Sequence, residues 1–167
     1  MVVRVARTDD EREAVFAVRR AVFVAEQGVD PALEYDEHDD AATVDHLLAL
    51  AVGTGATGDD VDVAAGDAVG AARLRPHPDR ESTAKLERVA VREPRRGDGW
   101  GRRLVCTAHG RARERGFERV HIHAQVPVTG FYERLGYRQV SEEFEEAGMP
   151  HVAMTCDLGE AVVDDAE

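Results

Sequence analysis

Lysine is almost absent from this sequence, in which Lys85 is the single example. Lysine and arginine together number 21 against 33 aspartates and glutamates, which gives a formal net charge of -12 at pH 7. Proteins bind nucleic acid largely by neutralising its phosphates with basic side chains, and an acidic chain repels those phosphates. The charge balance therefore argues against nucleic acid as the main partner.

The same charge balance has two open explanations. An acidic surface with almost no lysine is similar to the surfaces of proteins from salt-accumulating halophiles, where carboxylates hold hydrated cations and salt screens their repulsion. An acidic protein from a mesophile with a GC-rich genome is the alternative. We favour the halophilic interpretation, which predicts that the protein is more stable in molar KCl.

Cysteines and long apolar runs are also scarce. Cys106 and Cys156 lack metal-binding spacing and would be an unusual disulfide framework for a chain of this length, so we expect buried thiols. No apolar run is long enough to span a bilayer, and Met1 leads into a short strand-like segment without a basic leader. We therefore expect a cytoplasmic protein with no membrane partner.

Metal-binding patterns are missing as well. The acidic segment Glu34–Asp40 lacks the alternating ligands, central glycine and distal glutamate of a calcium-binding EF-hand loop. No His and Cys residues have a convincing metal-site spacing. We expect no metal, a solvated loop at Glu34–Asp40, and structural roles for His46, His121 and His123.

Short apolar and β-branched segments alternate with helical patterns, which predicts one α/β domain over residues 1–160. Strands are expected at residues 2–7, 46–52, 68–75, 86–91, 119–124, 137–141 and 151–157. The strands at 86–91 and 119–124 flank a helix, so they should be parallel within a mixed sheet. Residues 54–67 are predicted as a flexible hairpin loop and residues 161–167 as an acidic tail.

Helices are expected in three places. The first follows Thr8 and Glu11, which have the spacing of a capping box, and ends before Gly28. The second runs from the glycine-rich loop to Gly116, and a short third one covers Val128 to Leu135. Helices on either side of a mixed sheet complete the expected architecture.

A glycine-rich loop, Arg96–Gly101, lies between the strand at 86–91 and the second helix. Such a loop exposes backbone N–H groups to a phosphate at the start of a helix. A nucleoside-triphosphate P-loop would need Lys-Ser or Lys-Thr after Gly101, where this chain has Arg102 and Arg103. A dinucleotide-binding loop would need a third glycine at the position of Arg102. Both nucleotide interpretations are therefore weak.

The loop instead resembles the pyrophosphate loop of the GNAT superfamily of acetyl-CoA-dependent acyltransferases, since Arg96, Gly99 and Gly101 match Arg/Gln-x-x-Gly-x-Gly/Ala. A second segment, Gln125–Tyr137, resembles another GNAT signature, with Phe131-Tyr132-Glu133 at its centre. Further segments are similar to the ElaA-like branch, namely residues 20–27, His46, residues 88–91 and residues 148–154. The likeness covers nearly the whole chain except residues 54–67.

The resemblance implies a cosubstrate and the residues that hold it. Acetyl-CoA is the implied donor, with its pantetheine arm beside the backbone of Val89 and Val91 and near Gln125. The implied contacts of the diphosphate come from the loop and the start of its helix, namely Arg96, Gly97, Asp98, Gly99, Trp100, Gly101 and Arg102. Asp98 departs from the family pattern, because a carboxylate there must point away from the phosphates or weaken binding.

The resemblance also implies the chemistry. The chain is expected to transfer an acetyl group to a primary amine of a small molecule or protein by direct attack, with Tyr132 protonating the departing thiolate. Three residues stay open as the base: Glu87, Glu26 and His151. A longer acyl donor, a non-catalytic acyl-CoA sensor and an interaction domain without ligand are the alternatives, and a homodimer is one open assembly.

Overall fold

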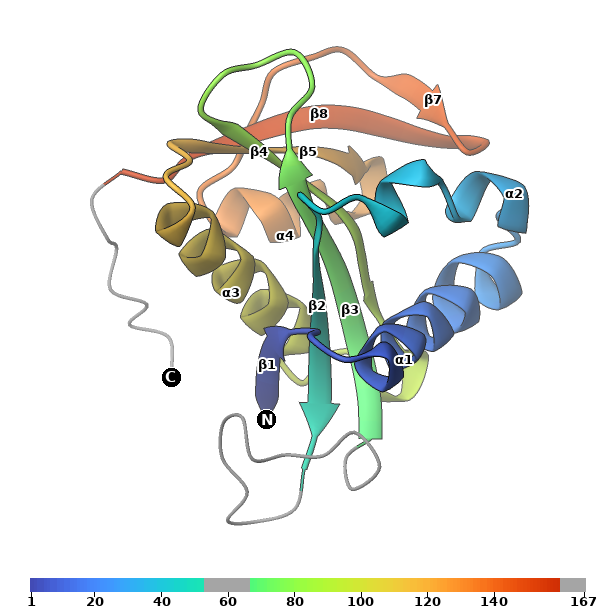
Figure 1. Cartoon of the computed structure of the whole chain (residues 1–167). Coiled ribbons are helices and arrows are strands. Elements are labelled where there is room, and N and C mark those ends of the chain that lie inside the picture. Colours follow the sequence, from blue (N-terminus) through green and yellow to red (C-terminus); the bar gives the residue numbers. More distant parts are fainter. Residues whose placement is uncertain (53–66, 160–167) are drawn as a thin grey trace.

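The strands form one mixed sheet (Figure 1). The computed structural model describes residues 1–52 and 67–159, and within them eight strands take the order β1-β2-β3-β4-β5-β8-β6, with β7 paired to β8. Their bounds are β1 (Val2–Val5), β2 (Asp45–Ala51), β3 (Asp67–Pro76), β4 (Thr83–Val91), β5 (Arg119–Gln125), β6 (Arg138–Gln139), β7 (Phe144–Glu146) and β8 (Met149–Asp157). The predicted mixed sheet is confirmed.

The helical segments connect and cover the strands. They are α1 (Asp9–Arg19), the π-helix η1 (Arg20–Glu26), α2 (Pro31–Glu34), α3 (Trp100–Glu114), α4 (Thr129–Arg134) and the short 3-10 helices η2 (Glu37–Asp40), η5 (Glu93–Arg95) and η6 (Val126–Val128). Thr8 caps α1, since its hydroxyl accepts from the Glu11 N–H at 3.1 Å. The first predicted helix is thus present, but its second half is wound as a π-helix, a rare form that is frequent at functional sites.

Two apolar clusters fill the opposite faces of the sheet. Leu48 and Leu50 of β2 pack toward α1 and η1, while Leu47 and the next alternate residue, Ala49, pack toward α3. This alternation follows from the two-residue period of a strand. Figure 1 shows α1 and α3 on the two sides of β2 and β3. A fully buried leucine contributes about 2 kcal/mol, so both helices are held firmly on the sheet.

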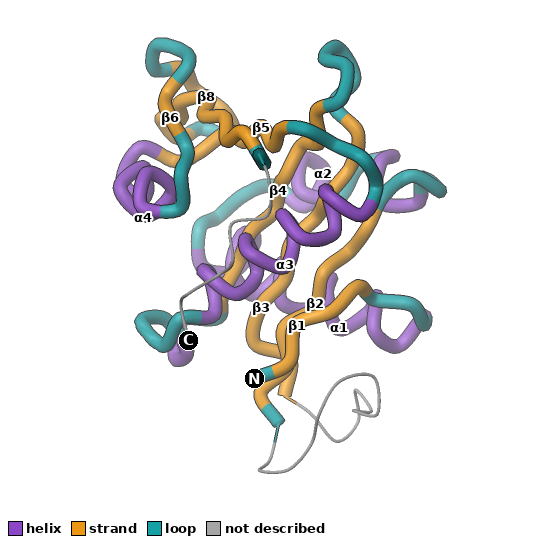
Figure 2. Tube along the Cα trace, turned by 90° about the vertical axis from the view of Figure 1, so that its left-hand side faces the viewer, coloured by secondary structure: helices purple, strands orange, loops and turns teal. Residues whose placement is uncertain are grey.

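Strands β4 and β5 are paired along only about half of their length. They are parallel and paired from Thr83 opposite Arg119 to Leu86 opposite Ile122, and no pair follows within these two described strands. Strand β4 also has an irregularity against β3, where Arg88 adopts a left-handed φ of 57°. Figure 2 shows β5, β8 and β6 turning away from β1–β4. The divergence opens the middle of the sheet.

Two predicted segments, at 34–40 and 137–141, differ in the structure, and two others lie wholly or largely outside the described residues. The segment Glu34–Asp40 is not a solvated loop, because it forms the end of α2 and η2 and buries Glu34 and Asp39. The strand predicted at 137–141 shrinks to β6, and β7 was not predicted. The predicted loop at 54–67 lies outside the described residues except for residue 67, which begins β3, and the predicted tail at 161–167 lies outside them altogether.

Candidate active site

The opening between β4 and β5 leads into a cavity of about 1050 Å³. Residues from η1, β3, β4, the glycine loop, β5, α4, β7 and β8 line it. Its volume lies at the upper end of the range usual for small-molecule and cofactor pockets. The predicted site residues Glu87, Val89, Val91, Arg96, Gly97, Gly99, Trp100, Gly101, Arg102, Gln125, Tyr132 and His151 all lie in this lining.

The glycine loop forms one end of the cavity. Gly97 and Gly99 have φ angles of 87° and 89°, a left-handed conformation that side chains disfavour. Added Cβ atoms there would meet nothing within 4 Å, so the backbone conformation and not space requires glycine. Gly99 is also the N-cap of α3 and gives it no side-chain cap. The first N–H groups of a 15-residue helix are therefore available to an anion at this end.

Arg96 joins this loop to the π-helix. Its Nε donates to the Val91 carbonyl at 2.9 Å, and its Nη2 is paired with the Glu26 carboxylate. Glu26, one of the three candidates for the base, does not line the cavity. Asp98 is exposed at the surface and does not line the cavity either. The structure thus associates Glu26 with the loop that was predicted to bind diphosphate.

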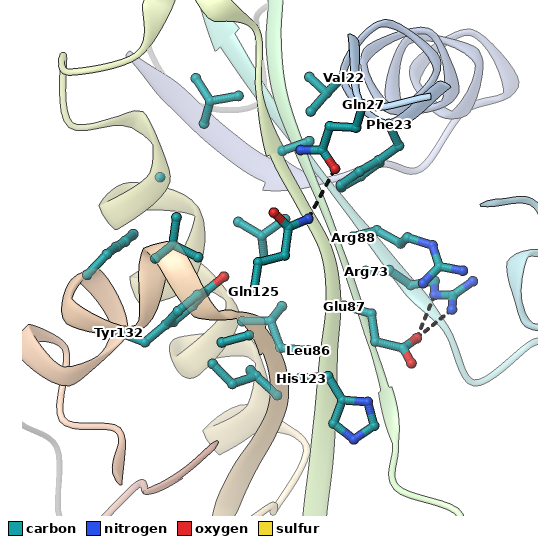
Figure 3. A pocket seen from close by; sticks show the side chains of 18 of the residues that line it. Val22, Phe23, Gln27, Arg73, Leu86, Glu87, Arg88, His123, Gln125 and Tyr132 are labelled. Carbon is teal, nitrogen blue, oxygen red and sulfur yellow. Dashed lines mark hydrogen bonds and ion pairs between the residues drawn. The ribbon is translucent and has the colours of Figure 1, made fainter. Parts of the chain in front are cut away.

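A hydrogen bond crosses the opening between the strands. The Gln125 side-chain amide at the end of β5 donates to the Gln27 Oε1 at 3.0 Å, directly after η1 (Figure 3). Beyond Leu86, β4 has no backbone partner in β5, so the edge that carries Val89 and Val91 faces the cavity. A free strand edge offers N–H and C=O groups to an extended ligand.

Two neighbouring tyrosines have different surroundings. Tyr132 stacks on Phe131 with ring centroids 5.0 Å apart, and its hydroxyl points into the cavity (Figure 3). Burial raises the pKa of Tyr132 to about 12, so the phenol stays protonated near neutral pH and is available as a proton donor. The Tyr137 hydroxyl is instead paired with the His109 Nε2 at 2.6 Å in the core. Of these two tyrosines, Tyr132 lines the cavity and Tyr137 belongs to the core.

Glu87 is surrounded by cations. Its carboxylate accepts from Arg75 Nε at 2.9 Å, pairs with Lys85 Nζ at 3.0 Å, and is bonded to Arg73 (Figure 3). Burial opposes ionisation, but these hydrogen bonds and charges outweigh it and hold the pKa of Glu87 well below its usual range. A carboxylate so stabilised in its charged form is a weak proton acceptor. Glu87 and these three cations together form part of the wall of the cavity.

A buried ion cluster continues this wall. Arg19, with no exposed side-chain surface, pairs with Glu34 at 2.9 Å and Asp39 at 2.7 Å, and Arg73 pairs with Asp39 at 3.0 Å. Burial opposes ionisation of Asp39, yet the hydrogen bonds from Arg19 and Arg73 lower its pKa to about 2. At Glu34 burial prevails and raises the pKa, although the charge of Arg88 acts in the opposite direction. The cluster fixes α1, α2 and β3 together.

The histidines divide into two groups. His46 is buried, and its Nε2 lies 3.0 Å from the Asp39 carbonyl, in keeping with the expected structural role. His121 is buried against the ring of His77. His151 and His123 both line the cavity, and for His123 this differs from the purely structural position expected. The nearby Glu146 also lines the cavity, and sequence reasoning missed it because β7 was not predicted.

The comparisons with known proteins agree with this geometry. Residues 61–158 match the family model described as the acetyltransferase (GNAT) domain, and the chain belongs to this family. A Bacillus subtilis (strain 168) protein named as an acetyltransferase is 35% identical over 158 residues, which cover 93% of this chain and 95% of that protein. ElaA of Escherichia coli (strain K12) is 29% identical over 154 residues, covering 89% of this chain and 88% of ElaA. The expected family and its ElaA-like character are confirmed.

Solved structures share the fold over nearly the full length. A Lactobacillus plantarum protein described as an N-acetyltransferase has a TM-score of 0.77 and 30% identity, covering 94% of this chain and 97% of that chain. An aminoglycoside 6'-N-acetyltransferase complexed with coenzyme A has a TM-score of 0.68 over 98% of this chain and 100% of that one. Its identity is only 14%, so this second likeness concerns the fold alone.

Two further observations concern the described part of the chain. Within residues 1–52 and 67–159, no three side chains of His, Cys, Asp or Glu are grouped so that they would hold a metal ion. None of the helices in those two ranges combines the length and apolar character needed to cross a membrane.

Proposed function

We propose that this protein binds acetyl-CoA in the opening between β4 and β5 and transfers its acetyl group to a primary amine by direct attack. One observation carries the proposal: a single cavity joins the glycine loop, the free edge of β4 and the Tyr132 hydroxyl. These three features match the three parts of the donor, namely an anion, an extended amide-containing arm and a thioester.

The diphosphate is proposed to lie against the loop from Arg96 to Arg102, at the start of α3. The left-handed Gly97 and Gly99 let the backbone approach the phosphates, and the positive end of the helix dipole favours them. The bonds that Arg96 forms with Glu26 and with the Val91 carbonyl hold its guanidinium at this end. Asp98 is exposed, which keeps its charge clear of the cavity.

The acetyl transfer itself is proposed as one attack with two proton movements. The lone pair of the neutral amine forms the new C–N bond, the C–S bond breaks, and the thiolate takes a proton from the Tyr132 hydroxyl. The amine proton passes to a base on the cavity wall. Exchange with solvent then restores Tyr132 and the base, so that protons balance over the cycle.

The contacts favour a histidine over a carboxylate as that base. Glu87 is held in its charged form by three cationic neighbours, and Glu26 is paired with Arg96 away from the cavity lining. His151 lines the cavity and stays a candidate among the residues predicted from the sequence. Imidazole has its unperturbed pKa near the working range of such a reaction, which suits a proton acceptor.

Two measurements test the proposed function. Calorimetric titration with coenzyme A should show binding, and release of free thiol from acetyl-CoA across a panel of primary amines should show transfer, with mass spectrometry detecting the acetylated product. Binding without thiol release for any amine would support the acyl-CoA sensor instead. A faster reaction with longer acyl thioesters of coenzyme A would show that the preferred donor is a longer acyl-CoA. The absence of coenzyme A binding at both low and molar KCl would contradict every coenzyme A function.

The charge balance supports a separate proposal, that the protein works at high salt. With a net charge of -12, repulsion between carboxylates opposes folding at low ionic strength, and salt screens it. Urea unfolding at low and molar KCl should give a higher transition midpoint at high salt. Equal midpoints would leave only the mesophilic explanation.

A further inference from the structure

His123 and Glu146 form a pair in the cavity wall, although they come from different strands. Along β5, Ile122 and Ala124 enter the apolar core, so the alternation of the strand places His123 on the opposite face. Strand β8 lies between β5 and β7, with Ala153 opposite His123 and Met149 opposite Glu146. The carboxylate reaches across β8 to the imidazole.

The hydrogen bond between them defines the state of the imidazole. Glu146 Oε1 lies 2.9 Å from His123 Nδ1, and the hydrogen bond from His123 lowers the pKa of Glu146, so the carboxylate is the acceptor. A carboxylate only accepts, and Nδ1 must therefore carry the hydrogen. In the neutral ring this leaves the lone pair on Nε2, the nitrogen away from Glu146. The pair thus has the arrangement of a carboxylate that orients a histidine base.

His151 is less suited to the same role. Its Nδ1 lies 2.8 Å from the Met149 carbonyl, an acceptor, so this nitrogen also carries a hydrogen. Its Nε2 faces Glu146 Oε2 at 3.8 Å, and only 7% of its side chain is exposed. Both nitrogens are thus directed at groups of the wall. The His123 side chain is 26% exposed and lines the cavity (Figure 3).

We propose that His123 is the general base of the reaction and that Glu146 is the residue that positions it. This inference rests on the proposed acetyl transfer. His123 Nε2 takes one proton from the amine as the C–N bond forms, while Tyr132 gives one proton to the thiolate as the C–S bond breaks. Glu146 keeps Nδ1 protonated and stabilises the imidazolium that results. The proton then leaves His123 for solvent through the exposed side of the ring.

The charges around His123 set the direction of the pH dependence. The titratable groups around it are Glu146 of β7, His151 of β8 and His121 of β5 itself, and Lys85 of β4, which is paired with Glu87, lies opposite His121. Burial, together with nearby cations, lowers the pKa of His121 to about 4, so this ring is neutral in the working range. Loss of the Glu146 carboxylate therefore removes an anion that is in contact with the His123 ring.

The first experiment needs no acceptor. Nitrogen-15 NMR of the histidine rings in the full chain, bound to coenzyme A as the probe, reports tautomer and pKa, and His123→Asn assigns the signal. His123 should be protonated at Nδ1 when neutral, and Glu146→Gln should weaken that preference. Glu145→Gln, next along the strand and exposed, is the matched control and should not change it. A neutral His123 protonated at Nε2 in the wild type would overturn the inference.

The second experiment measures thiol release against pH with an amine that the wild type accepts. His123→Asn should lower kcat at least roughly 100-fold. It should also remove the part of the acidic limb of the rate-against-pH profile that is due to the enzyme, whereas the part due to ionisation of the amine should remain in every variant. Glu146→Gln should move that limb to lower pH, with partial restoration in Glu146→Asp. Affinity for coenzyme A should not change. His151→Asn is expected to keep the limb.

The possible failures are distinguishable. A wild type that binds coenzyme A and acetylates no amine of the panel overturns both the proposed function and this inference. An active wild type whose His123→Asn and His123→Gln variants keep the rate and the limb overturns the inference alone. If only His151→Asn loses the limb, the base is His151 and the proposed function stands.

Discussion

The two ends of the cavity are built in different ways. The end proposed to hold the donor, called the donor end, is one continuous segment, the loop from Arg96 to Gly101 with the start of α3, and it presents mainly backbone groups. The end proposed to hold the acceptor, called the acceptor end, is assembled from α2, β3, β4, β5, β7 and β8, and it presents charged side chains and histidines. A binding site made of backbone groups needs few particular side chains. Buried charged side chains, in contrast, are stable only when oppositely charged partners from distant segments meet them.

Because of this difference, substitutions at the two ends should have different effects on binding and on folding. At the donor end, a substitution that keeps the helix should change binding and leave the fold intact. At the acceptor end, the residues that shape the cavity also hold the fold, because Arg73 joins Asp39 of the buried cluster to Glu87 of the wall. Four predictions test this contrast, from the largest expected effect to the smallest.

Arg19→Met should destabilise the protein by about 3 to 5 kcal/mol, because it removes a fully buried cation that pairs with both Glu34 and Asp39. Glu34 then retains Arg88, and Asp39 retains Arg73. Urea unfolding measures the loss. The matched control is Arg12→Met in the same helix, whose partner Asp40 has 88% of its side chain exposed. That variant should lose about 1 kcal/mol or less. Equal losses in the two variants would show that the cluster is no more important than a surface ion pair.

Gly99→Glu should weaken coenzyme A binding at least roughly 100-fold, since it places a carboxylate at a helix start proposed to hold phosphates. The φ of 89° at this position adds strain that the rest of the fold tolerates. Calorimetry measures the affinity and circular dichroism the fold. Gly110→Glu is the control, because an added Cβ in this part of α3 meets nothing within 4 Å. Unchanged affinity in Gly99→Glu would refute the proposed place of the diphosphate.

Tyr132→Phe should lower kcat by roughly 100-fold and leave the affinity for coenzyme A unchanged, because the hydroxyl acts only when the thiolate departs. Tyr137→Phe is the matched variant in the core. It removes the hydrogen bond to His109 and should cost about 1 kcal/mol of stability with little effect on kcat. The reverse pattern, with Tyr137→Phe slow and Tyr132→Phe active, would exchange the roles of the two rings.

Acid should weaken the acceptor wall in a defined window. The pKa of Asp39 is lowered to about 2, so its contribution is complete above the ordinary value near 4 and is lost as the pH falls toward 2. This amounts to about 2 kcal/mol, partly offset by Glu34, whose raised pKa acts in the opposite sense. Urea unfolding between pH 5 and 2 should therefore be less pH-dependent in Asp39→Asn than in Asp40→Asn. The same pH dependence in both variants would contradict the assignment of this stability to Asp39.

Much of the donor end was predictable because its signals are local. The residues of a glycine-rich loop between a strand and a helix indicate the conformation of that loop. The parallel arrangement of β4 and β5 followed from the helix between them. The N-cap at Thr8 was likewise readable from the sequence, since its hydroxyl accepts from the Glu11 N–H. The placing of coenzyme A and the roles of the site residues stay predictions that the experiments above address.

The acceptor end was less predictable because its partners are far apart in the chain. The segment from Glu34 to Asp40 looks like a hydrophilic loop until Arg19 and Arg73 meet its carboxylates in the interior. A charged residue carries no local sign that it will be buried, since burial depends on whether a partner arrives. The prediction of a solvated loop failed for this reason.

The sequence alone determined the family, the mixed sheet and the position of the glycine loop, because each is encoded in neighbouring residues with characteristic spacing. Only the tertiary structure decided which charged residues form the wall of the cavity and which histidines line it. Glu146 reaches His123 only because β8 lies between β5 and β7. Such contacts depend on the register of strands far apart in the chain, which no local pattern specifies.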